Sequence, residues 1–174
     1  QMCIRDRYYS DQVCDAISKL SQRLDWNVID KVLQAIHDSD SVAFFGTQFS
    51  HSAALHFQTD LLMLEKFTMA YMETERQIDC ARLMDENSVA IIVTVNGFYA
   101  RSNSKVLQYL KKSKCKVVLM TNNPGIDIGI NVNYTIVLGD SEQRKIGKHT
   151  LLTAVELMSL RYYSLYYPGL QEKI

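Results

Sequence analysis

The sequence predicts an α/β protein: a three-layer αβα sandwich around a five-stranded parallel sheet. Its 174 residues, 47% of them hydrophobic, suffice for one well-buried core and are too few for two full domains. Short apolar runs alternate with stretches of helical periodicity. Runs without polar alternation are typical of strands buried on both faces, and right-handed crossovers then place helices on both sides of the sheet.

Two helices are expected before the first strand. Apolar residues recur at spacings of four, three and four on the first of them: Val13, Ile17, Leu20, Leu24. The second covers 27–39. The opening letters QMCIRDRYYS have no clear period, so we leave residues 1–10 out of the expected fold as sequence that need not be native. We expect an N-terminal segment or linker helix at 1–25 and the folded domain at 26–174.

The strands are expected where the chain is apolar and rich in β-branched or aromatic residues. They lie at 41–45, 68–72, 88–95, 115–121 and 133–138. Helices are expected between the first four strands, at 51–66, 76–84 and 103–113. Parallel neighbours require such crossover connections, so the alternation itself favours a parallel sheet.

The last helix is expected at about 147–167, with a heptad-like seam. The seam residues recur at spacings of four and three: Leu151, Val155, Met158, Tyr162, Leu165. Two interpretations stay open at this point. The seam packs on the domain's own sheet, or it is the contact of a homodimer.

Composition and charge bear on the partners. Basic and acidic residues both number 19, so net charge gives no argument for a nucleic acid or a membrane surface as partner. No apolar run approaches the ~18 residues of a membrane span. The cysteines Cys3, Cys14, Cys80 and Cys115 are far apart, which favours free thiols over a zinc site or a disulfide framework. We expect a cytoplasmic protein with no membrane partner, metal or cofactor.

Polar residues follow three of the strands at the carboxyl edge, where parallel sheets bind ligands. In GTQFSHS, Gly46 permits a tight turn, and Ser50 is expected to cap a helix that begins at His51. A helix start with free N–H groups is a ready anion site. A third loop, TNNPG, follows the strand at 115–121.

The second loop, TVNGFYARSNS, crowds polar side chains between a buried strand and a helix. Asn-Gly favours positive φ and so explains Asn96 and Gly97 as a turn. It does not explain Thr94, Tyr99 and Ser102, which point to a ligand.

At these two loops the sequence resembles the SIS (sugar isomerase) domain, and more closely the sugar-phosphate-sensing half of RpiR/MurR-like bacterial transcription regulators. That family has a G-x-G-x-S turn after its first strand, directed at a phosphosugar. Here GTQFS keeps Gly46 and Ser50 and has Gln48 in place of the second glycine.

The family's second turn, S-x-S-G-x-T, corresponds to TVNGFY. Thr94 keeps a hydroxyl, Asn96 replaces a serine, Gly97 is kept, and Tyr99 stands where the threonine would be. The resemblance covers about 28–167, including the GDSE stretch at 139–142. It implies an SIS-like, flavodoxin-like sheet.

The resemblance also implies a ligand-sensing domain that binds a sugar phosphate or a related carbohydrate derivative. The implied ligand-binding residues are Gly46, Gln48, Ser50, His51, Thr94, Asn96, Gly97, Tyr99, Ser102 and Glu142. In the family a helix-turn-helix domain lies upstream, but the residues before the helix at 27 are too few for three packed helices. We expect DNA to be a partner only through that missing domain, and the chain itself to form a homodimer.

Two other functions stay open. A phosphosugar isomerase needs a base beside the carbon that loses its proton, and Glu142, His149 and His51 are the candidates, none of them in a recognisable catalytic motif. A dimerisation module with a decayed pocket is the other, because Gln48 and Tyr99 bring bulk where the family has small residues.

Overall fold

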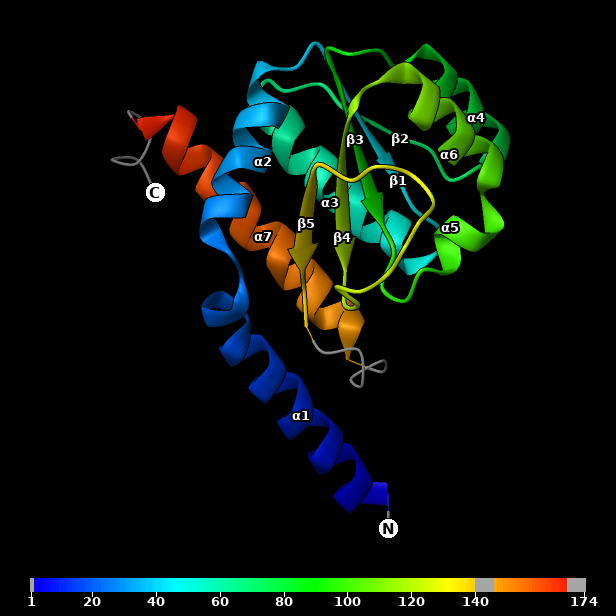
Figure 1. The fold of residues 1–174 in the computed structure, drawn as a ribbon. Coiled ribbons are helices and arrows are strands. Elements are labelled where there is room, and N and C mark those ends of the chain that lie inside the picture. Colours follow the sequence, from blue (N-terminus) through cyan, green and yellow to red (C-terminus); the bar gives the residue numbers. More distant parts are fainter. Residues whose placement is uncertain (1, 140–145, 169–174) are drawn as a thin grey trace.

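Five parallel strands form one sheet in the order β2-β1-β3-β4-β5, which confirms the expected sandwich (Figure 1). The computed structural model describes residues 2–139 and 146–168. The strands are β1 (Ser41–Phe45), β2 (Met69–Ala70), β3 (Ser88–Val93), β4 (Lys116–Thr121) and β5 (Tyr134–Val137). Parallel pairing brings their carboxyl ends to one edge, since Phe45 lies opposite Ile92 and Val93 opposite Met120.

The strand expected at 68–72 is shorter than predicted. β2 pairs with β1 through Met69 and Ala70 alone. It is an edge strand with a neighbour on one side, so fewer of its residues enter the ladder.

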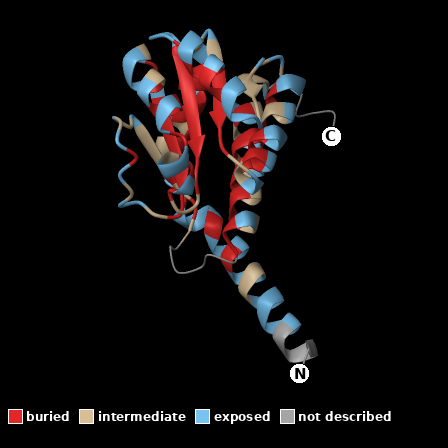
Figure 2. Ribbon diagram, turned by 90° about the vertical axis from the view of Figure 1, so that its right-hand side faces the viewer, coloured by how far each residue is buried: buried red, intermediate tan, exposed pale blue. Residues whose placement is uncertain are grey.

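Helices cover both faces of the sheet, as Figure 2 shows by the burial of the strands between them. On one face lie α2 (Trp26–Asp38), α3 (Phe49–Met63) and α7 (Gly147–Tyr166). On the other lie α4 (Thr74–Leu83), α5 (Phe98–Ser102) and α6 (Ser104–Ser113). Successive strand residues feed alternate cores: Val42 and Phe44 face the first layer, and Ala43 and Phe45 face the second. The short helix α5 was not expected.

The first helix, α1 (Met2–Arg23), corrects the treatment of residues 1–10, which continue the helix. Its buried side chains, Ala16 and Leu20, lie in its second half, and its first half projects from the body (Figure 1). Apolar periodicity reports only the part of a helix that packs, so it missed the projecting half. None of the helices in the described ranges is both long and apolar enough to span a bilayer.

The seam on α7 belongs to the domain's own core. Leu151, Val155, Met158 and Tyr162 are each at most 2% exposed and pack with the sheet, whereas Leu165 is 38% exposed. The heptad-like spacing therefore reflects packing on this chain's own sheet.

Candidate functional site

The loop after β1 turns sharply into α3. The N-cap of α3 is Gln48, so Ser50 lies in the first turn and does not cap the helix as expected. The backbone of Gln48 has φ 50° and ψ −121°, a conformation that side chains rarely adopt. This is the position at which the family motif has its second glycine.

Gly46 permits close contact between the end of β1 and the start of α3. A Cβ atom at Gly46 would lie 3.2 Å from Ser50 Cβ and 3.3 Å from the amide nitrogen of His51. Any larger residue would push α3 away from the strand, so Gly46 fixes where Ser50 sits at the edge of the sheet.

The loop after β3 leads into α5. Gly97 is the N-cap of α5 with φ 75°, as the Asn-Gly pair predicted, and a Cβ there would lie 1.9 Å from Ile126 Cδ1. The buried Thr94 hydroxyl accepts a hydrogen bond from the Tyr99 N–H at 3.3 Å. The hydroxyl that resembles the family's serine thus satisfies one of the free N–H groups in the first turn of α5.

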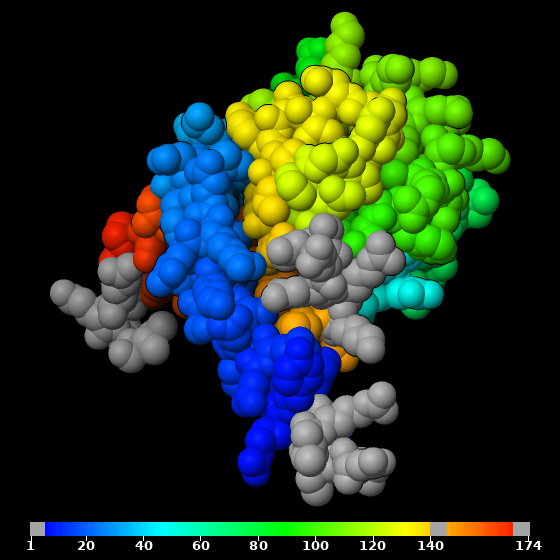
Figure 3. Space-filling model, turned by 60° about the horizontal axis from the view of Figure 1, so that its bottom comes forward, coloured from blue at the N-terminus to red at the C-terminus, as the bar shows by residue number. Residues whose placement is uncertain are grey.

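A buried glutamine ties the two loops together. Gln77, on α4, is 1% exposed, and its Nε2 donates hydrogen bonds to the carbonyls of Gly46 (3.0 Å) and Tyr71 (2.7 Å). Its Oε1 accepts the hydroxyl of Tyr99. The loops therefore lie side by side at the carboxyl edge, where Figure 3 shows the β1 loop (cyan) bordering the β3 loop (green). Sequence reasoning missed Gln77.

Tyr99 takes its side chain away from this edge. Its ring is 2% exposed in the second core, and burial raises the pKa of its hydroxyl well above the ordinary value. Tyr99 thus adds no bulk to the loop surface. Of the other residues expected here, Asn96 is half-buried, Ser102 is exposed at the end of α5, and Glu142 lies outside the described residues.

One cation reaches the β3 loop. Arg101 Nη1 lies 3.6 Å from where a Gly97 Cβ atom would be, so the guanidinium folds back over the first turn of α5. A guanidinium beside a loop with backbone N–H groups suits an anionic ligand.

His51 is the buried titratable group of the β1 loop. Burial lowers the pKa of its imidazole, and the charge of Glu73 partly opposes this shift. The ring is therefore neutral at pH 7 and able to accept a proton. His149, in the first turn of α7, shares a 3.1 Å hydrogen bond between its Nε2 and the hydroxyl of Tyr9.

The loop after β4 contributes a buried amide. Asn122 is 2% exposed, and its Oδ1 has no hydrogen-bond partner within the described ranges. Its Nδ2 lies 2.8 Å from the place a Gly147 Cβ would take, so that glycine lets α7 start against the strand ends. In the described part of the chain, the one group of three potential metal ligands lies elsewhere, between α3 and α7.

No protein-family model and no curated protein matches the chain in sequence. Several solved structures match it in fold. The sugar isomerase domain of an RpiR transcription factor from Sphaerobacter thermophilus has a TM-score of 0.77 and 15% identity, over 89% of this chain and 87% of that one. The Vibrio vulnificus NanR protein, solved with ManNAc-6P, has a TM-score of 0.81 and 14% identity, over 98% and 67%.

Isomerases match as well. A phosphoheptose isomerase from Francisella tularensis has a TM-score of 0.73 and 16% identity, over 93% of this chain and 98% of that one. The chain therefore has the fold of sugar isomerase domains, as the two loop motifs indicated. That fold is shared by regulators and by isomerases.

Proposed function

We propose that the two loops bind a sugar phosphate or a related carbohydrate derivative, and that the chain is the sensing domain of an RpiR-type transcription regulator. The observation that carries the proposal is the bridge through Gln77, which holds the β1 and β3 loops together at one edge. Ser50 and the α3 start supply donors from one side, and Arg101 supplies positive charge from the other.

The neighbours support the same ligand class. The Vibrio vulnificus NanR structure contains ManNAc-6P, and an E. coli protein of this fold was solved in complex with another sugar phosphate. In this proposal DNA contact comes from a helix-turn-helix segment outside these residues. The free thiols of Cys14, Cys80 and Cys115 suit a reducing cytoplasm.

A thermal-shift series with a panel of phosphosugars tests the ligand. A ligand that binds only the folded state raises Tm by mass action. We expect a rise for at least one phosphosugar, a smaller rise for Ser50→Ala and Arg101→Ala, and an unchanged rise for the matched controls Ser52→Ala and Lys105→Ala. A flat response across the panel would favour a dimerisation module with a decayed pocket.

Isomerase activity is the second candidate, and His51 is the observation that favours it. A neutral imidazole beside Glu73 at the ligand edge is a chemically suitable base. Incubation with fructose 6-phosphate or ribose 5-phosphate, with isomer detected by chromatography, tests this reading. An isomer formed by the native chain and lost in His51→Asn would support the enzyme, and no isomer with either sugar would count against it.

The homodimer is also part of the proposal, through the outer side of α7. Leu160 is 57% exposed there, and with Trp26 and Leu157 it lines a hollow of about 390 Å³. Light scattering measures the mass directly. We expect a dimer at micromolar concentration that Leu160→Glu dissociates, and a monomeric native chain would remove this interface.

A further inference from the structure

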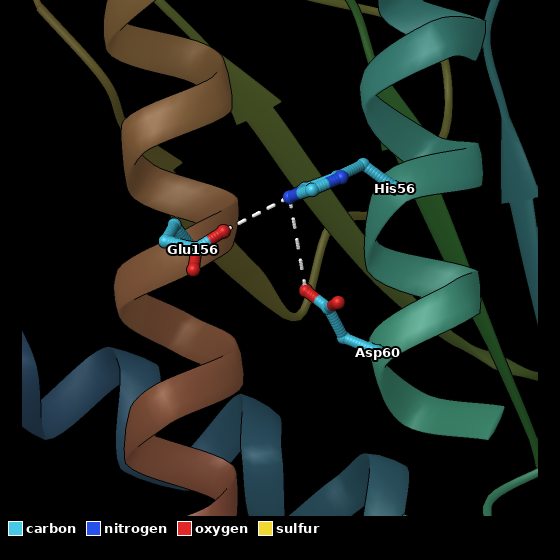
Figure 4. Close-up of side chains that lie close together, drawn as sticks. All are labelled: His56, Asp60 and Glu156. Carbon is cyan, nitrogen blue, oxygen red and sulfur yellow. Dashed lines mark hydrogen bonds and ion pairs between the residues drawn. The ribbon is translucent and has the colours of Figure 1, made fainter. Parts of the chain in front are cut away.

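Two helices of one layer bring a histidine and two carboxylates together, away from the loops. His56 and Asp60 are one turn apart on α3, and Glu156 faces them from α7 (Figure 4). His56 Nε2 lies 2.9 Å from Glu156 Oε2 and 3.9 Å from Asp60 Oδ2. We propose that these three side chains bind a divalent transition-metal ion, foremost Zn²⁺.

The separations suit such an ion. Zinc lies about 2.0–2.2 Å from nitrogen and oxygen ligands, so atoms that share one ion are about 3.0–3.5 Å apart. The 2.9 Å and 3.9 Å distances bracket this range, and all three ligand atoms lie within 4.8 Å of one another. Glu156 is 56% exposed, so small side-chain rotations can close the remaining gap. The imidazole favours zinc, cobalt or nickel over calcium or magnesium, which prefer oxygen alone.

The scaffold under the three ligands is rigid. Phe57 and Leu61, which follow His56 and Asp60 along α3, are both 0% exposed in the core. Ser159 Oγ donates a hydrogen bond to Asp60 Oδ2 at 2.7 Å and so orients that carboxylate. Outer contacts of this kind hold metal ligands in place and affect affinity.

The local charge also favours a cation. Asp60 and Glu156 share a single imidazole, and no lysine or arginine forms an ion pair with either of them across the described ranges. Negative charge is therefore in excess even when His56 is protonated. A bound divalent ion would balance it.

Calorimetric titration of the chelator-treated full chain with ZnCl₂ tests the proposal. We expect one ion per chain, and affinity at least tenfold weaker in His56→Ala and in Glu156→Gln. Ser159→Ala should weaken binding less than either. His149→Ala, a matched histidine on α7, and Cys14→Ser, which removes an exposed thiol, should bind zinc as the native chain does.

A second measurement keeps the test open should a variant fold poorly. Visible absorption of bound Co²⁺ reports ligand geometry directly, and Zn²⁺ should raise Tm of the native chain but not of Glu156→Gln. The proposal is overturned if the native chain takes up no zinc at millimolar concentration. It is equally overturned if His56→Ala binds as tightly as the native chain, or if binding is lost in Cys14→Ser.

Discussion

Gln48 holds a backbone conformation that glycine adopts more easily, with φ at 50°. A non-glycine residue in such a region costs about 1–3 kcal/mol, and glycine loses about 0.5–1 kcal/mol more backbone entropy on folding. We therefore expect Gln48→Gly to raise the free energy of unfolding by about 1 kcal/mol in urea denaturation. Ser52→Gly, inside α3, should lower it by about 0.5 kcal/mol. Equal losses in both variants would mean that Gln48 carries no strain.

Gln77 and Tyr99 should behave as one unit. Gln77→Met leaves the Gly46 carbonyl and the Tyr99 hydroxyl without their buried partner, which costs about 2–4 kcal/mol. Tyr99→Phe alone should cost about 1–2 kcal/mol. In the double variant we expect a coupling of about 1 kcal/mol or more, measured by a denaturation cycle. Additive losses would show that the hydrogen bond contributes nothing.

Residue-scale prediction from sequence succeeded where the cause is local. Asn96-Gly97 predicted a positive φ, and Gly97 has it. Gln77 was missed because its partners at Gly46 and Tyr99 are 31 and 22 residues away, and nothing in the sequence marks such pairings. Ser50 was misplaced as a cap because α3 begins two residues earlier than its apolar stripe.

At the scale of elements, α5 depends on one glycine. Gly97→Ala places a Cβ against Ile126 and forces a positive φ on alanine, which together cost about 2–4 kcal/mol. Ile126→Val removes the Cδ1 atom that clashes. In the double variant we expect the cost of Gly97→Ala to fall to about 1–2 kcal/mol, the part due to φ. Thermal unfolding of the four proteins measures this, and an unchanged cost would argue against the clash.

The elements that sequence predicted best are those with continuous apolar runs. The strands at 41–45 and 115–121 match β1 and β4 within one residue because they are buried on both faces. The five residues of α5 are too few to show a period, and polar turn residues surround them. The pairing of α3 with α7 at His56 and Glu156 was not predictable, because 100 residues separate them.

At the scale of the whole molecule, a bidentate ion pair joins α2 to α7. Arg161 Nε and Nη2 each donate to an Asp30 carboxylate oxygen at 2.8 Å, and these hydrogen bonds hold the pKa of Asp30 below its usual range. A lowered carboxylate pKa stabilises the fold above the ordinary value of about 3.9, and this stability is lost as pH falls through the lowered pKa.

Comparison of the native chain with Asp30→Asn tests this linkage. The Tm difference between them should be full at pH 6 and shrink as the pH falls below about 4. Asp15→Asn, which alters an exposed pair within α1, should show little difference at any pH. A Tm gap for Asp30→Asn that stays constant down to pH 2 would contradict the linkage.

The overall topology followed from the alternation of strand and helix, because a parallel sheet leaves few other arrangements. The projecting half of α1 did not, because its exposed side chains need no apolar period. The same half contacts the body through the Tyr9 hydroxyl and His149, in the first turn of α7.

The projecting helix has a mechanical consequence. From Leu20, its buried anchor, to Met2 the helix runs about 27 Å at 1.5 Å per residue. A tilt of about 10° at that fulcrum swings the far end by about 5 Å, so a displacement too small to notice near the strand ends becomes a stroke at the tip of the rod.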